Sequence, residues 1–314
     1  MNPTLQILLN KVGYPDLLEK LTRELSGSEL NSLLLEVFRM STVRITPQEL
    51  MTAYEKNRFV VPSVLDALTF AKASLQLLEL AKHHGFEGLE LSPLAPIGNC
   101  SSIALVDQNK VVSALRGTEV VADATNLLAL ESSKRRKSSR FDNEAIHLCT
   151  LHRHVRAQAI PGGKGFTPHF KVFCAVTAGK DTGNFDFEKQ AMLSHLVLYH
   201  DYFIQELRLS GLKIIIKGLK EDQSQRQHHP ELFNAIGERL PGAEVSQVEV
   251  SKADHAYYQH TRFSLNLVHH DKEYNLGDGG FVDWGQKFTS NHKERMFISG
   301  IGIELLLKVQ LGLI

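Results

Sequence analysis

The sequence has few cysteines and no long apolar run. Its three cysteines, Cys100, Cys149 and Cys174, are far apart and odd in number, which argues against a disulfide framework and favours a reducing cytoplasm. The chain does not open with a basic segment followed by an apolar stretch, and no apolar run approaches the roughly 20 residues of a membrane-spanning helix. We therefore expect a cytoplasmic protein without membrane contact.

An excess of charge of one sign is also missing. Lysine plus arginine and aspartate plus glutamate both number 35, so the formal net charge is zero, and no overall field would attract nucleic acid. The chain instead has 43% hydrophobic and 22% charged residues, a mixture typical of a globular protein with a large core. Its 314 residues allow one large domain, or a catalytic-size core with a smaller appendage.

The pattern of the chain changes near Pro62. Residues 1–61 contain leucine-rich stretches that predict an N-terminal helical appendage of unknown purpose. Beyond them, Ser63 and Asp66 predict the start of a helix over 64–83, whose apolar residues share one face. We expect residues 62–314 to form the core.

Strand patterns dominate the core. Residues 101–107 and 110–116 predict two strands joined by a tight turn at Gln108-Asn109, and the polar, basic stretch 132–142 predicts an exposed loop. Further strands are expected at 146–158, 168–178 and in three later segments, with helices at 187–209 and from about Ile303. Many strands and few helices predict an α+β fold rich in antiparallel pairs, not a doubly wound parallel sheet.

Two segments in the first half of the core carry candidate ligand-binding residues. Arg156 and Gln158 precede a glycine-rich turn, and a guanidinium there could hold two phosphate oxygens at once. Arg116, Thr118 and Glu119 precede a predicted helix, where a Thr-Glu pair could equally be an N-terminal cap.

Two later segments add aromatic, glycine and acidic positions. Paired glycines allow close approach of a backbone to a ligand, and a tyrosine hydroxyl can read a polar group, although two tyrosines in a strand are also typical of a core. The positions concerned are Tyr257, Tyr258, Gly279, Gly280 and Asp283, followed by Gly300, Gly302 and Glu304 in SGIGIELLL.

Taken in order, these segments resemble the catalytic core of class II aminoacyl-tRNA synthetases over residues 62–314. The pattern is most similar to the histidyl enzyme and to its non-charging paralogue, the regulatory subunit of ATP phosphoribosyltransferase. The resemblance implies an antiparallel sheet flanked by helices. It also implies a homodimer whose interface is built by helix 64–83 and the following strand, which ends at Pro93.

The resemblance also implies roles for the candidate residues. Arg156 would hold the α-phosphate of ATP, and Gln158 stands where the family usually has glutamate. Glu119 would meet a ligand ammonium, in a pocket shaped by Arg116 and Thr118. The tyrosine pair, the glycine pair and Asp283 match the amino-acid side of the histidyl pocket, while Gly300, Gly302 and Glu304 match the third motif, with Glu304 a possible Mg²⁺ ligand.

One departure from the family puts ATP chemistry in doubt. Leu305 stands where the third motif has an arginine that contacts the γ-phosphate, and loss of such a contact costs roughly 2–4 kcal/mol. ATP and Mg²⁺ are therefore possible but not assured cofactors. The sequence also ends about ten residues after Glu304, without an anticodon-binding domain. We expect a paralogue that binds an amino-acid-like ligand in a regulatory or accessory role, with a possible protein partner, and does not charge tRNA.

Alternatives remain open. The chain could be an ATP-dependent enzyme that adenylates an amino acid or another carboxylate for a non-tRNA acceptor. A weaker hypothesis is an RNA-binding module that uses the basic run KRRK at 134–137. Four residues, His147, Cys149, His152 and His154, are spaced as strand-borne zinc ligands could be, but no second cluster of fixed spacing accompanies them, and we predict no metal site.

Overall fold

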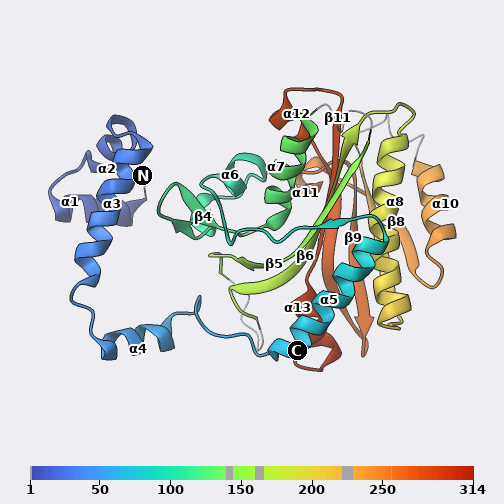
Figure 1. Ribbon diagram of the computed structural model, residues 1–314, viewed down its shortest axis with the longest axis horizontal. Coiled ribbons are helices and arrows are strands. Elements are labelled where there is room, and N and C mark those ends of the chain that lie inside the picture. The colour runs from blue at the N-terminus through green and yellow to red at the C-terminus, as the bar shows by residue number, and fades with distance from the viewer. Residues whose placement is uncertain (1, 139–143, 160–165, 221–228, 256) are drawn as a thin grey trace.

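An eight-stranded sheet forms the centre of the computed structural model (Figure 1), which describes residues 2–138, 144–159, 166–220, 229–255 and 257–314. The strands lie in the order β1-β5-β6-β11-β10-β9-β7-β8. Their bounds are β1 Glu87–Gly88, β5 Ile146–Val155, β6 His169–Lys180, β7 Leu212–Leu219, β8 Glu244–Val250, β9 Gln259–His269, β10 Lys272–Val282 and β11 Glu294–Ile301.

The sheet is mostly antiparallel. Its five internal pairings, from β5·β6 to β9·β7, are all antiparallel. The two outermost pairings, β1·β5 and β7·β8, are parallel. The predicted α+β class is confirmed, with a two-residue parallel pairing at one edge and a seven-residue parallel pairing at the other.

Helices cover both faces of this sheet and bury one apolar core on each. Consecutive residues of β5 point to opposite faces, so Leu148 joins one core and Cys149 the other. Helices α5, α8, α10 and α13 contribute to the core that contains Cys149, and α7 and α12 to the core that contains Leu148. Their bounds are α5 Ala67–His83, α7 Ala124–Arg136, α8 Asp186–His200, α10 His229–Arg239, α12 Trp284–Thr289 and α13 Ile303–Gln310.

Residues 97–116 differ from the expected hairpin. They contain the short helix α6 (Asn99–Ile103), the turn η2 (Gln108–Lys110) and β3 (Ser113–Ala114). Here β3 pairs with β4 (Thr118–Val120), which also pairs with β2 (Leu94–Pro96). The alternation of apolar residues was misleading because Cys100 and Ile103 are buried through the helical turn of α6.

Two further local predictions were wrong. Residues 132–136 belong to α7 and are not an exposed loop, because Ser132, Ser133 and Arg136 are buried. The side chain that caps α5 is Asp66, which accepts a hydrogen bond from the Thr69 N–H at 2.9 Å, and not Ser63. The helix expected at 187–209 is α8, continued by one π-helical segment, η4 (Asp201–Glu206).

The N-terminal appendage is helical, as predicted, and projects from one end of the core (Figure 1). It contains α1 Pro3–Val12, α2 Leu17–Glu19, η1 Lys20–Glu24, α3 Gly27–Thr42 and α4 Pro47–Lys56. A capping box begins each of the last two helices, at Ser26 and at Thr46.

Within the described ranges, no helix combines the length and the apolarity that crossing a membrane requires. The short helix α11 (Lys252–His255) completes the set of elements and leads toward the tyrosine pair.

Candidate functional site

A cavity of about 360 Å³ lies where β6, β10 and β11 meet the loop before α7 and the start of α13. The segments that form its walls are far apart in the sequence, so only the folded sheet brings them together. Its wall includes Asp123, Thr125, His154, Arg156, Cys174, Tyr257, Tyr258, Asp278, Gly300, Gly302, Glu304, Leu305 and Lys308.

Arg156 supplies an accessible positive charge to this cavity. It directly follows β5, and its Nε donates a hydrogen bond to the Ala122 carbonyl at 3.1 Å. One of its terminal nitrogens lies 3.8 Å from an Asp123 oxygen, and 38% of its side chain is exposed. The guanidinium also lies over the Phe170 ring, 5.2 Å from the centroid. Packed in this way, it is oriented to bind a carboxylate or a phosphate.

Two aspartates supply negative charge to the same cavity. Asp123 caps α7 by accepting hydrogen bonds from the Thr125 N–H at 3.0 Å and the Thr125 hydroxyl at 2.7 Å. Asp278, on β10, accepts a hydrogen bond from the Tyr258 hydroxyl at 3.1 Å. Burial raises the pKa of Asp278 more than this hydrogen bond lowers it. Neither aspartate was singled out from the sequence, although Asp123 stands at a recognisable helix start.

The tyrosine pair lies in the cavity wall. The rings of Tyr257 and Tyr258 are 4.6 Å apart between centroids, and their hydroxyls are 3.5 Å apart. Burial raises the pKa of both hydroxyls, so both stay protonated at neutral pH and can act as hydrogen-bond donors.

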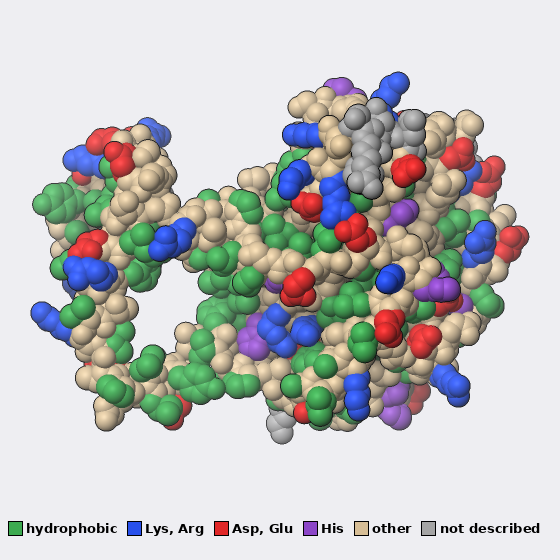
Figure 2. Space-filling view, in the orientation of Figure 1, with side chains coloured by type: hydrophobic (Ala, Val, Ile, Leu, Met, Phe, Trp, Pro, Cys, Tyr) green, Lys and Arg blue, Asp and Glu red, His purple; other side chains and the backbone are tan. Residues whose placement is uncertain are grey.

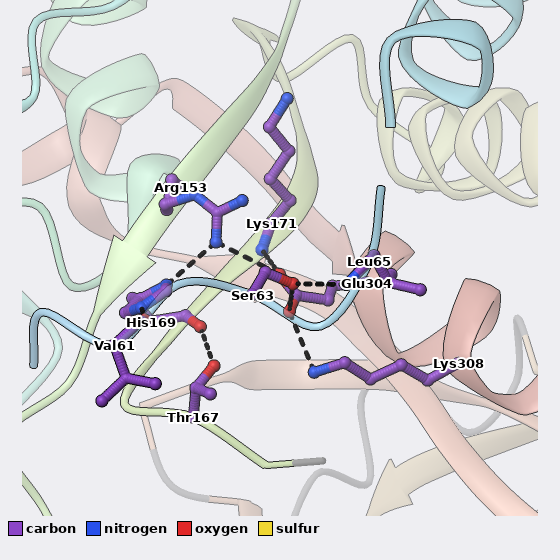
Figure 3. Close-up of polar contacts among 9 residues, drawn as sticks. All are labelled: Val61, Ser63, Leu65, Arg153, Thr167, His169, Lys171, Glu304 and Lys308. Atoms are coloured by element: carbon purple, nitrogen blue, oxygen red, sulfur yellow. Dashed lines mark hydrogen bonds and ion pairs between the residues drawn. The ribbon is translucent and has the colours of Figure 1, made fainter. Parts of the chain in front are cut away.

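Glu304 is the centre of a polar cluster at the α13 end of the cavity (Figure 3). Its carboxylate accepts hydrogen bonds from the Ser63 hydroxyl at 2.7 Å and the Lys171 N–H at 3.2 Å. It also forms ion pairs with Lys308 at 2.9 Å and Arg153 at 3.3 Å. Protein donors therefore occupy both oxygens, and a Mg²⁺ ion would have to displace some of them.

Lys308 brings a second cation to this wall. It lies on α13 one helical turn after Leu305, and both residues line the cavity. The resemblance to the family's third motif concerned position 305, where Leu305 replaces an arginine, and did not identify Lys308. The helical spacing of three residues was the signal that could have identified Lys308.

Three residues that were predicted to form the ligand pocket, Arg116, Thr118 and Glu119, do not line this cavity. Glu119 is fully buried, and its carboxylate accepts hydrogen bonds from the N–H groups of Gly98 and Cys100, at 2.8 and 3.1 Å, and from the Gln108 amide at 3.0 Å. The carboxylate is thus engaged by the start of α6, which precedes it in the chain, and it does not cap the helix that follows, because the N-cap of α7 is Asp123.

The neighbours of Glu119 are also engaged elsewhere. The Thr118 hydroxyl donates to the Leu115 carbonyl at 2.8 Å, and the Arg116 N–H donates to the Asn31 side chain at 2.7 Å. Arg116 itself has a positive φ of 66°. The acidic group that does face the cavity from this part of the chain is Asp123.

The glycine pair on β10 serves the packing of the sheet. A methyl group on Gly279 would lie 2.5 Å from the Ser299 side chain, and one on Gly280 would lie 2.6 Å from the Tyr258 ring. Asp283 pairs with Lys287 at 2.9 Å and is not part of the wall. Gly300 and Gly302 do line the cavity, as the third-motif comparison implied.

A smaller cavity of about 180 Å³ adjoins the first. It is lined by Gln158 and Lys110 and shares Asp123, Arg156 and Tyr257 with its neighbour. The arginine and glutamine that the sequence placed together therefore face connected spaces. Lys164, in the turn that follows them, lies outside the described residues.

One group of possible metal ligands is present in the described part of the chain. Asp123, His154 and Cys174 bring one ligand atom each to within 4.8 Å of one another. However, His154 Nε2 accepts a hydrogen bond from the Ala124 N–H at 3.0 Å, so its lone pair is already engaged. The four residues considered from the sequence cannot converge, because His147 and Cys149 point to the opposite face of β5 from His152 and His154.

Neither protein-family models nor curated protein sequences match this chain. Several solved structures do match it. Histidyl-tRNA synthetase from S. aureus is 18% identical with a TM-score of 0.59, over 80% of this chain and 68% of that enzyme. An ATP phosphoribosyltransferase regulatory subunit/histidyl-tRNA synthetase from Bacillus halodurans is 12% identical with a TM-score of 0.59, over 80% and 82% of the two chains.

A third similar structure comes from another synthetase. Pyrrolysyl-tRNA synthetase from Desulfitobacterium hafniense is 10% identical with a TM-score of 0.51, over 84% of this chain and 75% of the other. All three are class II synthetases or a regulatory relative, and these low identities establish architecture. The chain therefore has the fold of the class II aminoacyl-tRNA synthetases.

Proposed function

We propose that this chain is a paralogue of class II synthetases that binds an amino-acid-like ligand, with ATP as a second ligand, and does not charge tRNA. Its role would be regulatory or accessory. The observation that carries the proposal is the pairing of Arg156 with Asp123 and Asp278 around one cavity. An amino acid has a carboxylate for the guanidinium and an ammonium for an aspartate, and the Tyr257 and Tyr258 hydroxyls can bind further polar groups.

Nucleotide binding has less support in this cavity than amino-acid binding. Leu305 offers no charge to a phosphate, which favours binding without efficient activation of the amino acid. We further propose a cytoplasmic homodimer. The three cysteines are free, in keeping with a reducing compartment, and α5 exposes Leu68 and Leu75 on its outer side.

A second candidate function is ATP-dependent adenylation of an amino acid or another carboxylate for a non-tRNA acceptor. The observation that favours it is Lys308, which lines the cavity one helical turn after Leu305, with its ammonium 2.9 Å from Glu304. Arg156 would then stabilise charge on the α-phosphate during in-line attack, and Mg²⁺ would neutralise the remaining phosphates.

Ligand binding tests the first candidate. Thermal unfolding should be measured with each of the twenty amino acids, with and without ATP, and any stabilising compound confirmed by calorimetry. Arg156→Ala should weaken binding at least about tenfold, because a charge-assisted hydrogen bond contributes roughly 1.5–3 kcal/mol. Arg239→Ala, an exposed change on α10, is the matched control and should bind as wild type.

Amino-acid-dependent exchange of pyrophosphate with ATP separates the two candidates. Exchange that is lost in Arg156→Ala would establish adenylation and contradict the purely binding role. Binding without exchange supports the first candidate. If no amino acid and no nucleotide stabilises the protein, both candidates are wrong.

A further inference from the structure

The appendage exposes apolar side chains that it does not bury against its own chain. Among the described residues, 17 of the 27 large hydrophobic side chains classed as exposed lie between residues 2 and 61. Leu9 is the one buried residue in that range. A helical unit with so little core of its own is expected to pack on something else.

Helices α3 and α4 show this most clearly. Within these fully described helices no residue is buried. Leu33, Val37, Phe38 and Met40 on α3 are 44–66% exposed, as are three apolar residues of α4. Helices shorter than about 12–15 residues are marginal in water without tertiary packing, and α4 has 10 residues. We call the exposed apolar residues Leu33, Val37, Phe38, Leu50, Met51 and Tyr54 the arm surface.

The arm is attached to its own core through polar contacts. Asn31 accepts hydrogen bonds from the N–H groups of Arg116 and Gly117, at 2.7 and 3.3 Å. Arg58 donates to the carbonyls of Ala157 and Gln158, at 2.7 and 3.2 Å. These contacts hold the arm away from the core and leave its apolar residues uncovered. Figure 2 shows hydrophobic side chains along the arm and around the opening between it and the core.

Exposed apolar residues continue from the arm onto the core. Val60 and Val61, in the linker, are followed by Val64 just before α5 and by Leu68 and Leu75 on α5, and these last three are 59–69% exposed. We call these last three the α5 surface. One chain thus presents two apolar surfaces, and a two-fold axis could bury both of them twice in a reciprocal contact.

The charge and size of the arm fit a second copy of this chain. Residues 2–61 carry seven lysines and arginines and seven aspartates and glutamates, so they complement a neutral partner and not a strongly basic or acidic one. At roughly 200 Å² for a fully exposed large side chain, the arm surface and the α5 surface of one chain together expose on the order of 1,000 Å² of apolar area. A stable interface needs about 800 Å² from each partner.

We infer that residues 2–61 are a dimerisation arm, in which the arm surface of each chain packs on the α5 surface of a second copy. This inference rests on the homodimer proposed above and adds to it a role for the appendage. It does not depend on which ligand the cavity binds.

Light scattering after size-exclusion chromatography, over a range of concentrations, tests the arm with full-length variants. Leu50→Glu/Met51→Glu and Phe38→Glu should each weaken dimerisation at least about tenfold, because every substitution occurs twice at a two-fold interface. Gln48→Glu and Ser41→Glu add the same charge to exposed polar positions of the same helices and should leave the dimer intact. Leu68→Glu tests the α5 surface.

The possible outcomes separate the arm from the dimer. A wild-type monomer at the highest attainable concentration would overturn both proposals. A dimer that is broken by Leu68→Glu, but not by the arm variants, would leave the proposed dimer standing and overturn the arm. Because the substituted residues are exposed, circular dichroism should show wild-type folding in every variant.

A cross-linking experiment on the unmodified chain gives an independent readout. Equal amounts of ¹⁵N-labelled and unlabelled protein are mixed, allowed to exchange and treated with an amine-reactive cross-linker. Mixed-isotope peptides that join Lys56 or Lys20 of the arm to Lys72 or Lys82 of α5 are expected. If these lysine pairs are joined only within one isotope, the arm does not reach a second copy and the inference is overturned.

Discussion

At the scale of single residues, two carboxylates at the cavity, the buried Glu304 and the partly buried Asp278, have pKa values shifted in opposite directions. Burial raises the pKa of both. In Glu304, hydrogen bonds from Lys308 and Ser63 and the charges of Lys308 and Arg153 outweigh burial, so the pKa is lowered. In Asp278, burial and the charge of Asp123 outweigh the hydrogen bond from Tyr258 and the charges of Arg262 and Arg156, so the pKa is raised. Glu304 is therefore stabilised as an anion by its surroundings, whereas Asp278 needs a positively charged ligand.

Glu304→Gln should lower the free energy of unfolding by about 3 kcal/mol at pH 7, because it removes the negative charge that pairs with the buried Lys308 ammonium at 2.9 Å. Urea unfolding at several pH values measures the effect. A lowered pKa in the folded state contributes stability above the ordinary glutamate range, and this contribution is lost as the pH falls through the lowered value. The difference in the free energy of unfolding between variant and wild type should therefore shrink as the pH falls. Glu304→Gln/Lys308→Met is the control and should regain most of the stability.

Asp278→Asn should have the opposite effect on stability. A raised pKa in the folded state means that ionisation of Asp278 costs stability as the pH rises. The variant keeps an acceptor for Tyr258 and should unfold about 1–3 °C higher than wild type at pH 7, but not below the ordinary aspartate pKa of about 4. The same variant should bind an amino acid more weakly. A lower melting temperature at pH 7 would contradict this account of the site.

Predictions about single residues placed side chains at the cavity most reliably where the residue stands beside a long strand. Arg156 and Tyr258 line the cavity because each follows or precedes a long strand that was recognised correctly. Glu119 was assigned to a ligand, yet it satisfies the first turn of α6. A carboxylate near a helix start can serve either purpose, and the sequence does not say which N–H groups will surround it.

At the scale of secondary-structure elements, the basic stretch after Leu130 shows why charge alone is a poor guide to exposure. Arg136 belongs to α7, and its guanidinium makes a two-pronged ion pair with Glu294 of β11, with N–O distances of 2.9 and 3.0 Å. Both side chains are almost fully buried. This pair fixes the end of α7 on the sheet and could not be seen from residues 132–142 alone, because its partner is 158 positions away.

Arg136→Met should destabilise the protein by about 3–5 kcal/mol, because it leaves the Glu294 carboxylate buried and unpaired. Chemical unfolding followed by fluorescence of the single tryptophan, Trp284, measures the change. Lys134→Met, at an exposed position of the same helix, should change stability by less than about 0.5 kcal/mol. The double variant Arg136→Met/Glu294→Leu should recover most of the lost stability. If it does not, the pair does more than neutralise two buried charges.

Long elements were predicted more reliably than short ones. Strands β5, β6 and β9 have 10, 12 and 11 residues, enough for their alternation to stand out. The segment of α6 and β3 has elements of five and two residues, too short for a helical and a strand period to be distinguished. Its form was decided by contacts, including those of the buried Glu119.

At the scale of the whole molecule, the balance of charge bears on tRNA. The net charge is zero, Arg135 pairs with Glu87 and Glu131, and Arg136 is buried. Lys134 also lies 3.7 Å from Glu131, so three of the four charges of the run KRRK are paired within the protein, which weakens the RNA-binding hypothesis.

We expect no specific tRNA binding in filter-binding assays at a physiological ionic strength of about 0.15 M. Association at lower salt should be weak and equal for unrelated RNAs, because a chain of zero net charge attracts phosphates little and releases few counterions. Lys134→Ala/Lys137→Ala should not alter it. Tight, saturable tRNA binding that these two substitutions abolish would restore the RNA-binding hypothesis.

Although the 11-residue strand β10 was not predicted, the sequence by itself determined the α+β class, the other long strands and the helical appendage. These follow from local periodicity and from residues that stand close together in the chain. The tertiary structure alone decided which charges share the cavity, since Asp123, Asp278 and Lys308 come from three distant elements. It also decided that Glu119 is enclosed by protein donors and that the appendage leaves its apolar residues uncovered. Burial and pairing depend on what lies opposite a side chain, and that is set by the packing of the whole fold.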